Sequence, residues 1–274
     1  MDDQSNALVF MLLLKENASL PDAARVAARL KDISSSKYQL RWDAPKEYED
    51  GVCLQPYYLD GREAKVALMP IPIPWERLAE PCAENRLWPE AAEVCAQHRT
   101  HLLVGLKGEP DPLRRHLMLT HFAAALAQET DALAVLYWDN GGVVQPAEWL
   151  CRWAPEAGPE DLPLMLWINF HMFMHEGTPF VATRGLRTFG LMEVEAGSSS
   201  LKPMELLEYV YGAAHYQCLQ GPVLKDGDTV GASAEERHLV RHLPSVMDRD
   251  ETVIRILFEE PKQSRGLFSR LFKR

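Results

Sequence analysis

The stretch THLLVGLKGEPDPLRRHLMLTHFAAALAQ, residues 100–128, contains the pattern that decides the fold. A leucine-rich apolar run is followed by a short polar loop and then by a segment whose apolar residues recur at helical spacing. Asp111 and Pro112 stand where that segment begins, and an aspartate N-cap followed by a proline in the first turn is typical of a helix start. The stretch therefore predicts a strand, a loop and a helix in that order.

The same order occurs twice more in the chain. ALVFMLLL, residues 7–14, precedes a helix opened by Ser19, and FGLMEVEA, residues 189–196, precedes a polar loop and a helix that starts near Pro203. Three such units predict an α+β fold, with a mixed, largely antiparallel sheet or sheets and helices packed on one side. The recurrence also raises the hypothesis of two related halves.

A stretch rich in proline and acidic residues, 152–163, marks the expected domain boundary. It separates an N-terminal α/β half, residues 1–153, from a C-terminal ββαβαβ-like half, residues 162–260. We expect the two halves to form one compact unit. A basic amphipathic tail, residues 261–274, follows them.

Turn and capping signals predict further elements in both halves. An Asp-Gly pair at 60–61 is typical of a tight turn between two strands. Residues 164–175 and 187–196 are expected to be paired strands joined through residues 176–185. Ser233 and Glu236 have the spacing of a capping box, which predicts that a helix follows over residues 234–243.

The charge of the chain is unevenly distributed. The last fourteen residues hold five Lys and Arg and no acidic residue, so residues 1–260 carry 24 basic against 39 acidic residues, a formal charge of −15. Such an acidic body repels nucleic acid and suits a basic protein partner.

The cysteines and the apolar runs indicate the compartment. Five cysteines without a CxxC spacing indicate reduced thiols rather than a disulfide framework or a zinc site. The first apolar run is short and follows an acidic start, unlike a signal peptide, and no run is long enough for a membrane helix. We expect a soluble cytoplasmic protein with no stable membrane insertion.

The tail residues Leu267, Phe268, Leu271 and Phe272 form a narrow apolar stripe among basic residues. This pattern is typical of a segment that lies on an anionic membrane or docks on an acidic groove. Our default interpretation is a solvated tail that orders only on contact, because so short a segment forms a helix only marginally in isolation.

The loop VLKDGDTVGAS, residues 223–233, could belong to a metal site, a phosphate site or a turn. Counted from Asp226, the closing position of a calcium loop is Arg237, where such a loop needs a glutamate. A phosphate-binding Gly-Lys-Ser/Thr sequence is absent from the chain. We therefore interpret residues 226–229 as a turn.

The histidine pairs do not indicate a metal site. His171 and His175 share one face of the expected strand but are roughly 13 Å apart at about 3.3 Å per residue. His98 and His101 lie between a helix end and a strand start, where a histidine has a structural role without a ligand. No metal or other cofactor is expected.

Charged pairs in the C-terminal half have two interpretations each. Arg184 and Arg187 flank Gly185 and either bind a carboxylate or phosphate or form internal salt bridges with the acidic surplus. Glu193 and Glu195 alternate along a strand and form either a carboxylate pair or a solvated strand face, which we favour. No catalytic set emerges from these residues.

Four motifs together resemble a known family. The motifs TRGLRTFGLMEVEA, KPMELLEYVYGAAHY, VLKDGDTVGAS and TVIRILFEE, which start at residues 183, 202, 223 and 252, resemble a bacterial family described as domain of unknown function 4261, and the resemblance extends over residues 7–259. It implies a bacterial cytosolic α+β protein with no assigned catalytic residues. The positions that carry the resemblance are Thr183, Gly185, Gly190, Glu193, Asp226, Gly227, Asp228 and Thr229.

Our leading functional hypothesis is a non-enzymatic binding protein, specifically an immunity-type protein that covers a basic toxin such as a nuclease. The alternatives are an enzyme or small-molecule binder with a site near Arg184 and Asp228, and an accessory module held at a membrane by its tail. The candidate partner-binding residues are Thr183, Arg184, Arg187, Glu193, Asp226, Asp228 and Thr229.

Overall fold

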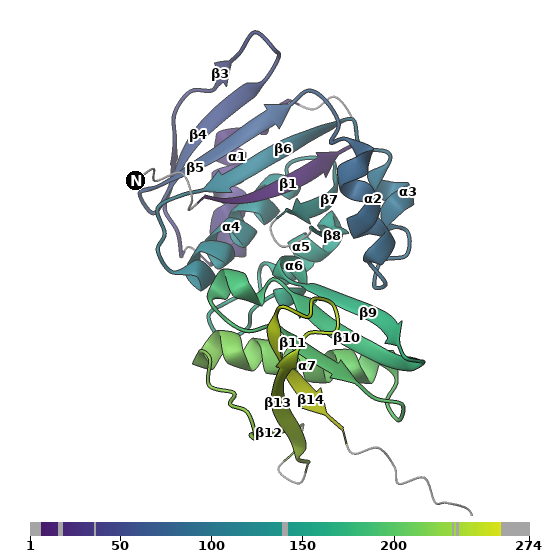
Figure 1. Ribbon diagram of the computed structural model, residues 1–274. Coiled ribbons are helices and arrows are strands. Elements are labelled where there is room, and N and C mark those ends of the chain that lie inside the picture. Colours follow the sequence, from purple (N-terminus) through teal and green to yellow (C-terminus); the bar gives the residue numbers. More distant parts are fainter. Residues whose placement is uncertain are drawn as a thin grey trace, which may run out of the picture.

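The computed structural model describes residues 7–15, 19–35, 37–138, 142–231, 233 and 236–258. These residues form two β-sheets, each with its own helices, arranged as two lobes (Figure 1). The α+β fold class with largely antiparallel sheets is therefore confirmed. The predicted tail, residues 261–274, lies outside the described residues.

The N-terminal lobe is built on a sheet of eight strands in the order β2-β4-β5-β6-β1-β7-β8, with β3 also paired to β4. Every pair in this sheet is antiparallel. The first strand of the chain thus lies inside the sheet, between β6 and β7. The strands are β1 Leu8–Leu14, β2 Leu40–Trp42, β3 Lys46–Glu47, β4 Cys53–Leu59, β5 Arg62–Met69, β6 Thr100–Leu106, β7 Ala132–Tyr137 and β8 Val143–Pro146.

Helices cover both faces of this sheet, whereas the sequence predicted one covered side. In β1, Leu12 and Leu14 face the main core and Leu13 faces a smaller one, because successive strand residues point to opposite faces. The main core holds residues of α1 (Ala23–Ile33), α4 (Pro112–Ala127) and α5 (Ala147–Trp153), and the smaller core holds residues of α2 (Trp75–Glu84) and α3 (Ala91–Cys95).

Helix α4 begins as the sequence predicts. The side chain of Asp111 accepts hydrogen bonds from the backbone N–H groups of Leu113, at 2.9 Å, and Arg114, and Pro112 is the first helical residue. In α1 the cap is Asp22 rather than Ser19, since its carboxylate accepts from Arg25 N at 2.9 Å. Both caps satisfy N–H groups that would otherwise lack a partner.

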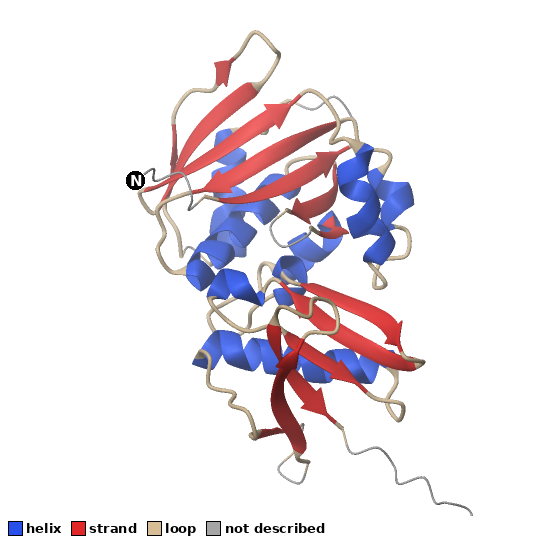
Figure 2. Ribbon diagram, in the orientation of Figure 1, coloured by secondary structure: helices blue, strands red, loops and turns tan. Residues whose placement is uncertain are grey.

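The C-terminal lobe contains a sheet of six strands in the order β12-β13-β14-β11-β10-β9. The β11–β14 pair is parallel and the other four pairs are antiparallel. Helix α7 lies along one face of this sheet (Figure 2). The elements are α6 Leu164–Trp167, β9 Asn169–His175, β10 Thr178–Arg184, the 3-10 helix η3 Leu186–Phe189, β11 Val194–Gly197, α7 Pro203–Gln220, β12 Thr229–Val230, β13 His238–Pro244 and β14 Thr252–Leu257.

Two predictions for this lobe are wrong. Strand β9 pairs with β10, which was expected to be a connection, through a tight turn in which Glu176 and Gly177 have φ values of 49° and 80°. Residues 238–244 form strand β13 instead of the predicted capped helix, because residues 239–244 pair with β14 and His238 pairs with β12. Pairing with neighbouring strands outweighs the local capping signal.

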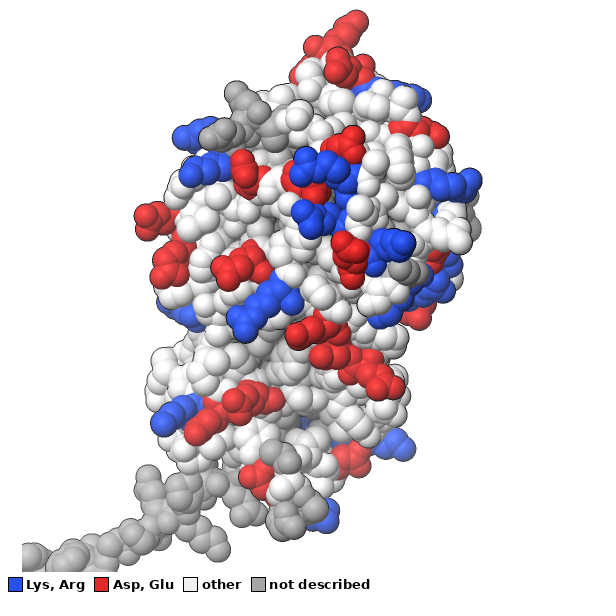
Figure 3. Space-filling view, turned by 180° about the vertical axis from the view of Figure 1, so that it is seen from behind, with Lys and Arg blue, Asp and Glu red and all other residues white. Residues whose placement is uncertain are grey.

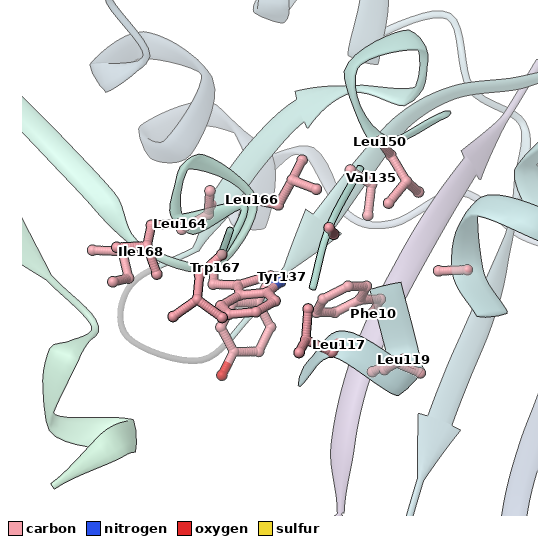
Figure 4. Packing of buried hydrophobic residues seen from close by; sticks show 14 of the residues in the cluster. Phe10, Leu117, Leu119, Val135, Tyr137, Leu150, Leu164, Leu166, Trp167 and Ile168 are labelled. Carbon is pink, nitrogen blue, oxygen red and sulfur yellow. The ribbon is translucent and has the colours of Figure 1, made fainter. Parts of the chain in front are cut away.

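One core connects the two lobes. Helix α6 leads from the N-terminal lobe to β9, and its residues Leu166 and Trp167 belong to the same buried cluster as Tyr137 of β7 and Phe10 of β1 (Figure 4). Trp167 Nε1 donates to Thr120 of α4 at 2.9 Å, and both residues are fully buried. Apolar residues of both sheets belong to this single cluster.

Candidate functional site

Glu193 lies near the end of the signature TRGLRTFGLMEVEA and is buried. Its carboxylate accepts a hydrogen bond from Thr183 Oγ1 at 2.6 Å and from Gly185 N at 2.9 Å, and Thr183 Oγ1 in turn accepts from Val194 N at 2.8 Å. A buried carboxylate is stable only when its oxygens are paired in this way. Thr183 and Glu193 therefore fasten the end of β10 to the start of β11.

Glu195 is also buried and has its own set of partners. Its carboxylate accepts from Arg255 Nη2 at 2.6 Å, from Val246 N at 3.1 Å and from Ser245 Oγ. Glu195 and Arg255 are register partners on the parallel strands β11 and β14. The favoured interpretation of Glu193 and Glu195 as a solvated strand face is thus wrong, since both are fully engaged inside the lobe.

The loop at residues 223–231 contains the predicted turn. Gly227 has a φ of 92°, and Asp228 closes the turn by accepting from Lys225 N at 2.8 Å. Asp226 accepts from His242 N at 2.7 Å and from Arg241 Nε at 2.9 Å, and these hydrogen bonds, the backbone one first, lower the pKa of its carboxyl. The carboxylate of Asp226 therefore binds β13, that of Asp228 stabilises the turn, and Thr229 begins β12.

The predicted site residues do not form one site. Arg187 pairs with Glu251 at 3.2 Å between Nε and Oε1, while Arg184 is exposed at the end of β10. Asp228 lies next to β12, four strand positions away from β10 in the sheet, which corresponds to roughly 19 Å at about 4.8 Å per strand. The seven residues thus lie in three separate places. Thr183 and Glu193 belong to a buried hydrogen-bond network, Arg184 and Arg187 lie at the surface, and residues 226–229 form a turn.

The histidine pairs have structural roles. His98 Nε2 accepts from Ile73 N at 2.8 Å, and His101 Nδ1 lies 2.9 Å from the carbonyl of Ile71. His171 Nδ1 lies 3.2 Å from Glu84 Oε2 of the other lobe, and burial, with a smaller effect of Arg184, lowers the pKa of His171 to about 4. The imidazole of His171 is therefore neutral at pH 7 and makes a hydrogen bond rather than an ion pair. Within the described ranges, no three His, Cys, Asp or Glu side chains lie close enough to hold a metal ion.

His116 is fully buried where the two lobes meet. Its ring packs against Trp167 and Phe189, its Nδ1 donates to the carbonyl of Pro112 at 2.7 Å, and its Nε2 accepts from the Tyr137 hydroxyl at 3.1 Å. Burial lowers the pKa of this histidine to about 3. His116 is thus a neutral, doubly hydrogen-bonded part of the core.

A hollow in the described surface runs between α7 and the segment that leads into β12. We call it the α7 groove, and it has a volume of about 960 Å³. Sequence reasoning missed it, although KPMELLEYVYGAAHY shows acidic and aromatic residues at helical spacing. The lining residues are Leu201, Glu205, Glu208, Tyr209, Gly212, Ala213, Tyr216, Val223, Leu224, Asp228, Thr229, Val230, Gly231, Ser233, Glu236 and Arg237.

The chemistry of the α7 groove is acidic and aromatic. Four carboxylates and one guanidinium line it. Tyr209 donates its hydroxyl to Glu236 Oε2 at 2.8 Å, and Tyr216 keeps 49% of its surface exposed at the other end of the helix. Such a surface is suited to Lys and Arg side chains, whose stems pack on aromatic rings while their charges meet carboxylates.

Gly212 lies in the middle of α7, in the wall of the groove. A glycine inside a helix costs about 0.5 to 1 kcal/mol relative to alanine. A Cβ atom placed on Gly212 would have no heavy atom within 4 Å, so no contact in the described structure requires glycine here. The absence of a side chain at this position widens the groove.

A second, smaller hollow of about 490 Å³ lies along a neighbouring face of α7. Trp153, Met204 and Tyr211 give it a largely apolar lining, and Glu208 borders both hollows. Figure 3 views the molecule from the side on which α7 covers its sheet. On this face, the junction of the two lobes and the C-terminal lobe below it show more Asp and Glu than Lys and Arg. Helix α7 thus presents an acidic surface between two hollows.

The fold and this surface define a two-sheet α+β protein with an acidic groove along its longest helix. Residues 182–257 match the model of a family described as domain of unknown function (DUF4261). The predicted resemblance is thereby confirmed for residues 182–257, from the end of β10 to β14, and the match does not include residues 7–181. No curated protein and no solved structure matches the chain. None of the described helices is long and apolar enough to cross a membrane.

Proposed function

We propose that the chain is a binding protein whose α7 groove receives a basic segment of a protein partner. The observation that carries the proposal is the groove itself, which combines four carboxylates with the exposed ring of Tyr216 and the half-buried ring of Tyr209. Opposite charge across an interface steers association and selects the partner, while aromatic side chains supply most of the affinity.

The specific role that we propose is that of an immunity-type protein that neutralises a basic toxin in a bacterial cytoplasm. The formal charge of −15 over residues 1–260 supports a basic partner. A toxin that acts on nucleic acid carries a basic surface, and an acidic groove can cover such a surface directly.

The enzyme or small-molecule alternative has less support from the geometry. Its proposed site combined Arg184 with Asp228, but these residues lie four strand positions apart. Glu193 and Glu195 are the buried carboxylates within the family signature, and both are held by hydrogen bonds that stabilise the sheet.

A peptide-display selection on the full-length protein tests the binding function. We expect the selected peptides to combine Lys or Arg with Leu, Phe or Tyr, and to bind at least tenfold more weakly at high salt, because salt screens exposed charges. Replacing Gly212 by tryptophan fills the groove and should abolish their binding. Gly158→Trp is the matched control, since a Cβ atom added to Gly158 would also have no heavy atom within 4 Å, but this glycine lies outside the groove.

The outcome of the selection decides the proposal. Peptides without basic residues, or peptides that bind Gly212→Trp as well as the wild type, would contradict it. The specific role is tested separately by co-expressing the chain with the product of its neighbouring gene. A toxic basic product whose toxicity is relieved by the wild type but not by Gly212→Trp would support that role, and relief by both proteins would refute the groove as its basis.

A further inference from the structure

We infer that residues 261–274 of the chain are themselves a ligand of the α7 groove, which a protein partner must displace. This inference rests on the proposed function, because it treats the same groove as the binding site. It adds regulation in cis, in which the chain carries a competitor for its own site.

The composition of residues 261–274 complements the groove. The segment has five Lys and Arg and no acidic residue, and Leu267, Phe268, Leu271 and Phe272 form its apolar stripe. The groove offers four carboxylates together with the rings of tyrosines and the side chain of Leu224. Both charge and apolar character therefore match.

The described chain leads directly to the groove. Strand β14 ends at Leu257, and the ring of the next residue, Phe258, lies 5.1 Å from the ring of Tyr209, centroid to centroid. Tyr209 lines the groove, so the remaining residues, 259–274, start beside it. From residue 205 to residue 216, α7 is roughly 17 Å long at 1.5 Å per residue, which about five extended residues can span.

Gly212 provides an independent indication of a close ligand. Alanine would stabilise α7, and the described structure contains no atom that would oppose a Cβ at this position. The position is open toward the groove, where a bulky side chain of a bound segment can approach the helix backbone. A phenylalanine of residues 261–274 is suited to this space.

Attachment to the same chain makes even a weak ligand effective. A short flexible linker gives an effective concentration on the order of 1 mM. With an affinity of about 100 μM for the free segment, partner binding becomes about tenfold weaker than for an uncovered groove. A partner whose basic and aromatic segment binds the groove more tightly displaces residues 261–274, whereas weakly binding basic ligands do not.

A labelled synthetic peptide with the sequence of residues 261–274 tests the inference on full-length protein. It is titrated against the wild type and against a variant in which the four stripe residues, Leu267, Phe268, Leu271 and Phe272, are replaced by aspartate. We expect the variant to bind the peptide about tenfold more tightly than the wild type, because its groove is uncovered. Adding Gly212→Trp to the variant should remove this binding, and a scrambled peptide of the same composition should bind at least tenfold more weakly.

Equal peptide binding by the wild type and the stripe variant would overturn the inference, as would binding that Gly212→Trp does not change. If the display-selected peptides still bind the groove in that case, the proposed function stands and only the cover in cis is refuted. If neither kind of peptide binds, both proposals fail.

The apolar stripe of residues 261–274 could also bind a membrane surface. Co-sedimentation with vesicles of phosphatidylcholine and phosphatidylserine distinguishes membrane binding from binding to the groove. We expect the wild-type protein and the stripe variant to sediment equally little with these vesicles. Sedimentation of the wild type alone, together with no peptide binding at the groove, would overturn the inference and assign residues 261–274 to a membrane surface.

Discussion

Arg255 lies directly opposite Glu195 across the parallel β11–β14 pair, and its guanidinium donates to the Glu195 carboxylate at 2.6 Å. The side chains are 18% and 2% exposed, so water contributes little to their solvation. The pair joins two strands that are far apart in the sequence. It is therefore a key contact for closing the C-terminal sheet.

Replacing Glu195 by glutamine should lower the free energy of unfolding by about 3 kcal/mol, because it leaves a largely buried guanidinium without its counter-charge. Urea unfolding monitored by tryptophan fluorescence measures this change. Glu63→Gln is the control, since its pair with Lys65 is about half exposed and should contribute less than about 1 kcal/mol. Equal effects of the two substitutions would contradict the prediction.

Replacing Thr183 by valine should cost about 1 to 3 kcal/mol, because it removes the hydroxyl that donates to Glu193 and accepts from Val194 N. Thr183→Ser keeps the hydroxyl and should cost less than Thr183→Val. The comparison is made by urea unfolding of both variants. A larger loss for serine than for valine would show that methyl packing, rather than the hydroxyl, stabilises this position.

Replacing Gly212 by alanine should raise the free energy of unfolding by about 0.5 to 1 kcal/mol, because alanine restricts the unfolded chain and meets no steric opposition in α7. Thermal and urea unfolding check the sign. A destabilised Gly212→Ala protein would mean that the backbone at this position needs glycine for the fold, and the glycine would then no longer indicate a close ligand in the groove.

The stability of the protein should decrease as the pH falls from about 6.5 toward 3. In the folded state burial lowers the pKa of His116 to about 3, whereas an unfolded histidine titrates near 6.5. Between these values the unfolded chain binds more protons, so the free energy of unfolding falls with pH by up to about 1.4 kcal/mol per unit for this group. Above pH 7 the group contributes no slope. The His116→Phe variant, measured by urea unfolding at pH 6 and pH 5, should show a shallower dependence than the wild type.

Local patterns predicted the elements whose signals lie within a few residues. The strand and helix of residues 100–128 are confirmed because the cap, the proline and the apolar spacing all belong to one segment. The Asp60-Gly61 turn joins β4 and β5, since both residues adopt the positive φ that such a turn needs.

Contacts between separate elements, which local patterns do not show, account for the errors. Strand β10 contains Pro179 and was interpreted as a connection, but it pairs with both β9 and β11. Glu193 and Glu195 resembled a solvated face because their partners, Thr183 and Arg255, are recognisable only once the strands are paired. The α7 groove was missed for the same reason, since its second wall comes from the residues that follow the helix.

The position of β14 in its sheet has a consequence for biosynthesis. It is the last described strand in the sequence, yet it lies between β13 and β11 in the interior of the sheet. Until it emerges from the ribosome, β13 and β11 each keep an open hydrogen-bonding edge, and such edges promote aggregation. The C-terminal lobe therefore completes its sheet only after residues 252–257 have been synthesised, and we expect a chain truncated before Thr252 to be a substrate for chaperones rather than a folded protein.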